Sequence, residues 1–251
     1  MIEIAIFSDI HGNLPALKVV VKDIEQRGID QMYCLGDLVD FAPWGNEVIE
    51  CIRDLKIPCL LGNHDERLAF NNPIIPIPHH DAEETMQRTK AINHSKDTIT
   101  EANKKWMSQL PYTIELRYKI KDTFRKVLLV HASTRSNDEY IHVGHDSKDL
   151  EGMLTLSGAD VIVMGHTHIA YQKEILLGGN DKRLLLNDGS VGRSREADRL
   201  ASYAILRISE QGITAEIVKL EYPVQEVADA IFKSDIPDFY GNFLLNGNVT
   251  V

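Results

Sequence analysis

The sequence predicts an α/β (α+β) fold, which we expect to form a single domain over residues 1–251. In its first part, short apolar and β-branched runs alternate with amphipathic segments, a pattern typical of βαβ units that build a parallel or mixed sheet. Between residues 171 and 220, short strands separated by turn signals favour antiparallel pairing. In addition, several apolar runs end in side chains that can bind a metal.

The expected elements follow from these runs in chain order. Apolar runs predict strands at 4–7, 32–35, 59–61, 112–118, 126–130, 161–164, 173–177, 183–187, 202–208 and 214–220. Helical spacing of apolar residues predicts helices at 14–27, 47–55, 147–156 and 224–232. Gly28 and Pro58 are the stop signals after the first two helices.

Two segments differ from this pattern. Residues 73–110 open with three prolines and continue polar and helical, so we interpret them as a capping insertion over the sheet edge, with His79 and His80 in a surface loop. The tail is apolar at Phe239, Tyr240 and Phe243. We expect it to pack on its own chain, and a contact between subunits of a homo-oligomer is the alternative.

Composition restricts the class of protein. The chain is 43% hydrophobic and 25% charged, as in ordinary globular proteins, and no apolar run approaches the ~20 residues that a membrane-spanning helix needs. The first residues lack the basic start of a secretory signal, so we expect a cytoplasmic protein. Cys34, Cys51 and Cys59 match no metal-binding or redox spacing and are expected to be free thiols. A formal charge of −10 argues against a dedicated binder of duplex nucleic acid.

Five apolar runs each end in a residue that can ligate a metal. In open α/β sheets, ligands bind beyond the carboxyl ends of the strands, so these five ends are expected to meet in one crevice. The candidate residues are Asp9, His11, Asp37, Asn63, His64, His131, His166 and His168.

Local spacing supports this interpretation. Residues two apart on an extended chain point the same way, as we expect of Asp9 with His11 and of the two histidines at 166 and 168. Glycines at 36, 62 and 165 precede candidate ligands, where the backbone must turn and pass close to the site. Mixed oxygen and imidazole ligands suit Mn²⁺, Fe or Zn²⁺, and a bridging carboxylate holds two such ions ~3.5 to 4 Å apart. Asp37 is the natural bridge.

The motifs as a set resemble those of the calcineurin-like metallophosphoesterases, in the same order along the chain. They are Asp9-Ile10-His11, Gly36-Asp37, Gly62-Asn63-His64-Asp65, His131 and Gly165-His166-Thr167-His168. The compact prokaryotic phosphodiesterase branch is the most similar, because Ser8 to Asn13 matches its first motif. Its final Asn-Pro-Gly-Ser turn corresponds to residues 187–190, where Asp188 replaces the proline.

The resemblance implies a four-layer αββα sandwich, in which two mixed β-sheets are flanked by helices. It also implies two divalent ions, with Mn²⁺ expected and Fe, Zn or Ni as alternatives. One ion would be held by Asp9, His11, Asp37 and His168, and the other by Asp37, Asn63, His131 and His166. In the implied reaction a metal-bridging hydroxide attacks phosphorus, His64 protonates the leaving oxygen, and Asp65 orients His64.

The substrate implied is a small phosphate mono- or diester, and several alternatives stay open. A non-catalytic scaffold would keep the fold and lose catalytic residues, as a retromer subunit resembling this family does. A dinucleoside-polyphosphate hydrolase, a cyclic-nucleotide phosphodiesterase or a protein Ser/Thr phosphatase would share the metal core. Arg193 and Arg195 either contact a phosphate or are solvated charges.

Overall fold

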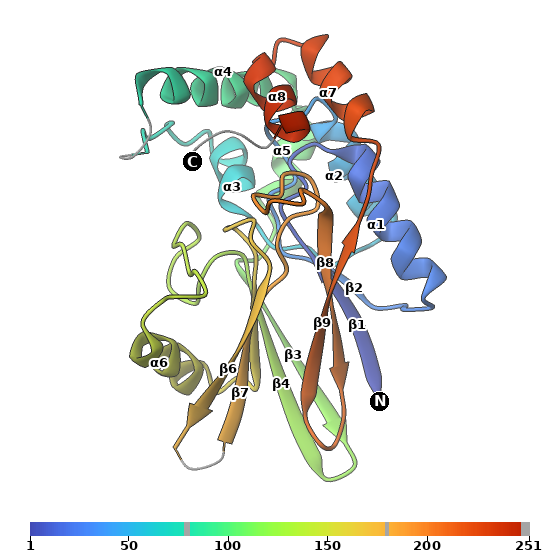
Figure 1. Ribbon diagram of the computed structural model, residues 1–251, viewed down its shortest axis with the longest axis vertical. Coiled ribbons are helices and arrows are strands. Elements are labelled where there is room, and N and C mark those ends of the chain that lie inside the picture. The colour runs from blue at the N-terminus through green and yellow to red at the C-terminus, as the bar shows by residue number, and fades with distance from the viewer. Residues whose placement is uncertain (78–80, 179–180, 247–251) are drawn as a thin grey trace.

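The computed structural model describes residues 1–77, 81–178 and 181–246, which form two mixed sheets packed face to face (Figure 1). The first sheet has the order β2 (Met32–Cys34), β1 (Ile2–Phe7), β8 (Ala201–Ile208) and β9 (Ile213–Leu220). In this sheet β1 and β2 run parallel, whereas β8 is antiparallel to both of its neighbours.

The second sheet has the order β3 (Thr113–Ile120), β4 (Thr123–Val130), β5 (Val161–Met164), β7 (Asp181–Asn187) and β6 (Tyr171–Leu177). Its centre is parallel, because β5 pairs in the same direction with β4 and β7. Both edges are antiparallel hairpins. The loops that follow β1, β4 and β5 carry the candidate ligands Asp9, His131 and His166.

Alternating side chains on β1 divide the core into layers. Ile4 and Ile6 face the second sheet and pack with Leu129 and Val163, whereas Phe7 faces the opposite way, toward helices. Successive side chains of a β-strand point to opposite faces of the sheet. Because β1 is buried on both faces, its alternate side chains pack into two different layers of the core.

Helices cover both outer faces and complete the expected αββα sandwich. The first sheet is covered by α1 (Leu14–Gln26) and α2 (Gly45–Asp54), which pack Leu17 and Ile49 into the same cluster as Phe7. On the other side, α6 (Ser147–Ser157) packs Leu154 against Ile162 of β5. The predicted fold class is confirmed.

A third group of helices lies beyond the carboxyl end of β1 (Figure 1). It contains α4 (Ala82–Thr98), α7 (Val224–Phe232) and α8 (Asp238–Asn246), and α5 (Glu101–Met107) follows α4. Ala91 of α4 packs with Ile231 of α7 and with Tyr240 and Phe243 of α8. The apolar tail thus packs on its own chain, as expected, and forms a helix that we did not predict.

Two further differences from the predicted elements concern the site. The run 59–61 forms only one bridge, between Cys59 and Cys34, because the chain then turns directly into a helix. That helix, α3 (Asn63–Ala69), was not predicted and begins at a metal-ligand candidate. The surface loop expected at His79 and His80 lies outside the described residues.

Two expectations from composition are checked by the structure. Within the described ranges, no helix is long and apolar enough to cross a membrane. All three cysteines are free thiols, with Cys34 and Cys59 buried and Cys51 partly buried.

Candidate metal centre

The candidate ligands meet where the strands end, as predicted. They form two buried groups, within each of which the potential ligand atoms lie within 4.8 Å of one another. The first group is Asp9, His11 and His168, and the second is Asp37, His131 and His166.

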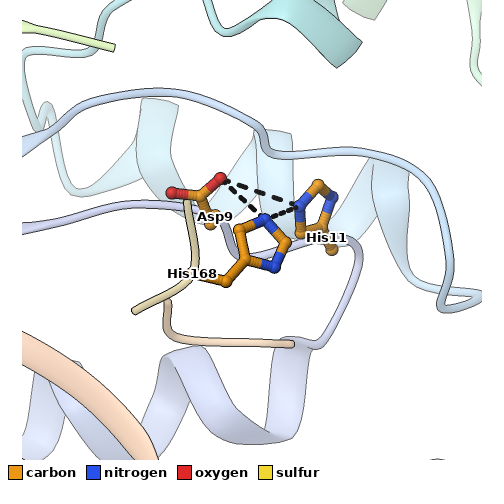
Figure 2. A group of neighbouring side chains, drawn as sticks. All are labelled: Asp9, His11 and His168. Carbon is orange, nitrogen blue, oxygen red and sulfur yellow. Dashed lines mark hydrogen bonds and ion pairs between the residues drawn. The ribbon is translucent and has the colours of Figure 1, made fainter. Parts of the chain in front are cut away.

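The first group joins the loops that follow β1 and β5 (Figure 2). Asp9 Oδ1 lies 3.1 Å from His168 Nε2 and 3.8 Å from His11 Nε2. The two Nε2 atoms lie 3.0 Å apart. One carboxylate oxygen and two imidazole nitrogens therefore converge on one point.

The second group is centred on His131, which follows β4. Its Nε2 lies 3.4 Å from Asp37 Oδ2 and 3.0 Å from Asn63 Oδ1. The His166 ring lies 5.2 Å from the His131 ring, measured between centroids. Asp37 Oδ2 is also 3.8 Å from His11 Nε2, so this oxygen faces both groups, as a bridging ligand must.

Three of the histidines are held in one tautomer by the backbone. His11 Nδ1 donates to the carbonyl of Val39 at 2.9 Å, and His131 Nδ1 donates to that of Leu35 at 3.0 Å. His168 Nδ1 donates to the carbonyl of Arg193 at 2.7 Å. A neutral imidazole that donates through Nδ1 presents a lone pair at Nε2, so these carbonyl contacts leave Nε2 free to bind a metal.

This arrangement fits divalent cations. In neutral rings the lone pairs at His11 Nε2 and His168 Nε2 face each other, which is repulsive unless a cation lies between them. Asp9 Oδ1 and His166 Nε2 are buried and have no hydrogen-bond partner among the described residues. Unpaired buried acceptors are costly, and a divalent ion bound by the two groups would satisfy them all.

The electrostatics agree with metal binding. Burial lowers the pKa of both His11 and His166 to about 3, so these rings are neutral and ready to ligate. Burial also acts to lower the pKa of His131, but the charge of Asp37 and their hydrogen bond raise it to about 10. A metal ion at that position would displace this proton.

The backbone at the candidate ligands is not extended. Our argument that residues two apart point the same way because the chain is extended was therefore wrong. Asp9, His11, His166 and His168 all have positive φ, between 50° and 65°. Asp9 and His11 still face one group, but His166 and His168 turn to different groups. Left-handed conformations in non-glycine residues are uncommon and concentrate at functional sites, where surrounding contacts maintain them.

All three glycines show the close approach that we predicted, and Gly36, with a positive φ, lies directly against the backbone of Gly62. A Cβ at Gly62 would overlap the amide nitrogen and carboxylate of Asp37, and one at Gly165 would overlap the side chains of Ser8 and Asp9. Gly62 and Gly165 allow the backbone to pass directly behind a ligand.

His64 lies beside both metal-ligand groups, at the start of α3, with its ring 5.1 Å from that of His11. Its Nδ1 lies 2.5 Å from Asp40 Oδ2, and Asp40 is also 3.7 Å from Arg67. Burial raises the pKa of Asp40 to about 6 and lowers the pKa of His64 well below its ordinary value, because charges are costly out of water.

Comparison with known proteins agrees with this geometry. The family model for the calcineurin-like phosphoesterase superfamily domain matches residues 2–211. The chain belongs to this superfamily. It is 34% identical over 260 residues to an uncharacterized protein of Methanocaldococcus jannaschii, an alignment that covers 97% of this chain and 98% of the relative.

Solved structures show the same fold. A metallophosphoesterase from Sphaerobacter thermophilus is similar with a TM-score of 0.74 at 23% identity, covering 98% of this chain and 99% of the other. A hypothetical protein from Pyrococcus horikoshii is similar with a TM-score of 0.78 at 18% identity, covering both chains completely. The protein is thus a metal-dependent phosphoesterase, with residues that suit divalent metal ions.

The partner that we expected for His64 in this phosphoesterase was wrong. Both oxygens of Asp65 accept hydrogen bonds from backbone amides, those of Asp37 and Leu38 at 2.8 Å and that of Gly62 at 3.2 Å. Asp65 therefore positions the loop that carries Asp37, and Asp40 contacts His64. The sequence did contain a signal for this partner of His64. It is a second acid three residues after Asp37, in the sequence Gly36-Asp37-Leu38-Val39-Asp40.

Asp188, which replaces the proline of the phosphoesterase turn, is completely buried below the site. Ser8 Oγ lies 2.5 Å from Asp9 Oδ2 and 2.7 Å from Asp188 Oδ1. One hydroxyl hydrogen cannot serve two carboxylates, so a proton on Asp188 completes the chain from Asp188 to Ser8 to Asp9. Burial, together with the charge of Asp9, raises the pKa of Asp188 well above its ordinary value, which agrees with this assignment.

Proposed function

We propose that this phosphoesterase hydrolyses small phosphate mono- or diesters with two divalent ions, and that His64 protonates the leaving oxygen. The observation that carries the proposal is the pair of converging ligand groups that share Asp37 Oδ2, next to His64. One ion would be held by Asp9, His11, Asp37 and His168, and the other by Asp37, Asn63, His131 and His166. Mn²⁺ is the expected ion, with Fe, Zn or Ni as alternatives.

When bound, two divalent ions supply an activated water and neutralise charge on the phosphoryl group. The chain supplies the rest. Asp37 joins the two groups, and its position is maintained by the backbone amides that Asp65 holds. His64 lines the cavity in front of Asp37, and its Nδ1 contact with Asp40 leaves Nε2 to transfer a proton.

We also propose that residues 1–251 form one domain and that residues 73–110 act as a cap that selects the substrate. In support, Ile77 and Arg88 from this segment line the cavity at the metal-ligand groups. Removal of part of α4 is expected to change the ranking of substrates more than the rate with the best one. An unchanged ranking would contradict the proposal.

The function is tested with metal-depleted protein and two colorimetric substrates, nitrophenyl phosphate and bis-nitrophenyl phosphate. We expect no turnover without metal and recovery with Mn²⁺. His64→Ala should lose ~10² to 10⁴-fold in rate on an alkyl phosphate, whose leaving oxygen needs a proton, and under ~10-fold on the nitrophenyl esters. It should still bind Mn²⁺, because only the acid is removed. The matched control is His145→Ala, since His145 pairs with Asp149 on α6, away from the metal-ligand groups.

A non-catalytic scaffold is the alternative that the sequence left open. It would be supported if no divalent metal gave turnover with either substrate. The complete set of ligands and the His64–Asp40 contact argue against it, since a scaffold has no need of an acid beside the metals.

A further inference from the structure

Three arginines lie around the metal-ligand groups without taking part in them. Arg88 comes from α4, and Arg193 and Arg195 come from the loop between β7 and β8. We call them the arginine cluster. They line one cavity of about 60 Å³ together with His64, His166 and other residues of the site.

Two arginines of the cluster have no ion-pair partner among the described residues. Arg193 is only 8% exposed, yet among the described residues neither Arg193 nor Arg195 forms an ion pair, and the Nε atoms of both are buried without a hydrogen-bond partner. Arg88 donates to the carbonyl of Ile75. The acid on α4 that lines the cavity, Glu84, caps its own helix by accepting from the Asp81 amide. Buried cations without a partner are costly, so a ligand anion is the natural compensation.

Aromatic rings fix the position of the Arg193 guanidinium. Its guanidinium carbon lies 4.7 Å from the ring centroids of Phe41 and Phe243 and 5.5 Å from that of Tyr240. Stacking of this kind occupies the faces of the guanidinium and leaves its N–H edge free to donate. A planar fork of fixed donors matches two oxygens of one phosphate group.

Charge balance indicates that this anion is additional to the phosphoryl group at the metals. Two divalent ions bring four positive charges, of which Asp9 and Asp37 offset two, and a phosphate monoester brings about two negative charges. The metal centre with its substrate is then close to neutral. The arginine cluster brings three further positive charges against the one negative charge of Glu84, and a second phosphate group would offset the remaining two.

The cavity also opens into a space that can hold the rest of a larger substrate. A groove of about 880 Å³ shares Asn63, Arg88, Tyr140 and His166 with the cavity. Tyr140 is 37% exposed, and its ring lies 4.2 Å from that of His166 and 5.9 Å from the guanidinium carbon of Arg195. An exposed ring beside the cluster provides a contact surface for an organic group attached to the phosphates.

We propose that Arg88, Arg193 and Arg195 bind a second phosphate group of the substrate, so that the preferred substrates are small molecules with two or more phosphates. This inference rests on the proposed function, because it places the first phosphoryl group at the metals. It makes the arginine cluster the specificity determinant of that site.

The test measures binding without turnover, by calorimetry on Mn²⁺-loaded protein. The probes are propylphosphonate, with one anionic group, and bisphosphonates whose two groups are separated by one, two or three carbon atoms. We expect the best bisphosphonate to bind at least ~10-fold more tightly than propylphosphonate, since one charge-assisted hydrogen bond contributes about that factor. Arg88→Met, Arg193→Met and Arg195→Met should each remove most of this difference and change propylphosphonate affinity by less than ~3-fold.

The control is Arg117→Met on β3, which should retain the full difference because Arg117 lies on an exposed strand edge. If Arg193→Met fails to fold, Arg195→Met provides the test, because the ring that its guanidinium lies over is the partly exposed Tyr140. Three results would overturn the proposal: a bisphosphonate that binds no more tightly, a preference that persists in all folded variants, or equal losses with both probes. The last would show that the arginines bind the metal-held group. Failure of the proposed function is separate, because it is read from hydrolysis of nitrophenyl phosphate by the wild type.

Discussion

His64 Nδ1 lies 2.5 Å from Asp40 Oδ2, and the two residues come from different segments, the start of α3 and the loop after β2. Both groups are removed from bulk water, and Asp40 is completely buried. This contact orients the ring, and the charge of an ionised Asp40 opposes the effect of burial, which lowers the pKa of His64.

Asp40→Asn should therefore weaken the acid more than the metal centre. For an alkyl phosphate, whose leaving oxygen needs a proton, we expect kcat/KM to fall ~10²-fold or more. For nitrophenyl phosphate, whose leaving group departs as a stable anion, the loss should be under ~10-fold. Steady-state kinetics of wild type and variant give the loss in kcat/KM on each substrate. Equal losses on the two substrates would contradict the role of Asp40 in proton transfer.

Asp188→Asn should stabilise the protein at neutral pH. Burial raises the pKa of Asp188 well above its ordinary value, so wild-type protein must take up a proton at this site on folding. That cost grows as the pH rises above the unfolded pKa of ~3.9, whereas asparagine is neutral and can still donate to Ser8. We expect the variant to be more stable than the wild type at pH 7 and close to it in stability near pH 4.

Urea denaturation at pH 4, 5.5 and 7, at one Mn²⁺ concentration, measures this difference. Asp235→Asn, at an exposed position, is the control and should show no such trend. A gain that does not grow with pH would mean that Asp188 is ionised in the folded protein.

Gly165→Ala should disrupt the first metal-ligand group. The new methyl group would overlap the side chains of Ser8 and Asp9, so Asp9 must move away from His168. We expect Mn²⁺ affinity to fall by ~10-fold or more, comparable with the effect of removing a group that hydrogen-bonds to a metal ligand. Gly144→Ala, where no atom lies within 4 Å of the new methyl group, should bind Mn²⁺ normally, and calorimetric titration compares the two.

Removal of metal should lower the melting temperature. Without cations, the buried carboxylates of Asp9 and Asp37 repel each other, and Asp9 Oδ1 and His166 Nε2 have no hydrogen-bond partner among the described residues. Ligand binding at 100 times its dissociation constant stabilises by about 2.7 kcal/mol, which corresponds to roughly 5 to 10 °C in a chain of this size. Thermal unfolding with EDTA and with excess Mn²⁺ measures the shift. Asp37→Asn should show a much smaller difference in melting temperature between EDTA and Mn²⁺, because the substitution weakens the side chain that faces both metal-ligand groups.

Much of the site was predictable because the motifs are local. Each ligand follows an apolar run, and parallel strands bring their carboxyl ends together, so convergence of Asp9, Asp37, His131 and His166 needed no knowledge of distances. The partner of His64 was not predictable in this way. Asp65 is its neighbour in sequence, yet the first turn of α3 directs that carboxylate to the backbone amides of the preceding loop.

The sequence by itself determined the layered α/β fold and the identity of the metal-ligand candidates, because strand period and strand-end chemistry are properties of short segments. Only the tertiary structure decided which of those residues belong to each of the two metal-ligand groups. His166 and His168 face different groups because their backbone is left-handed, and such a conformation is maintained by contacts far away in the chain. The arginine cluster likewise exists only in three dimensions, where α4 and the β7–β8 loop meet beside Asp37, the residue that faces both metal-ligand groups.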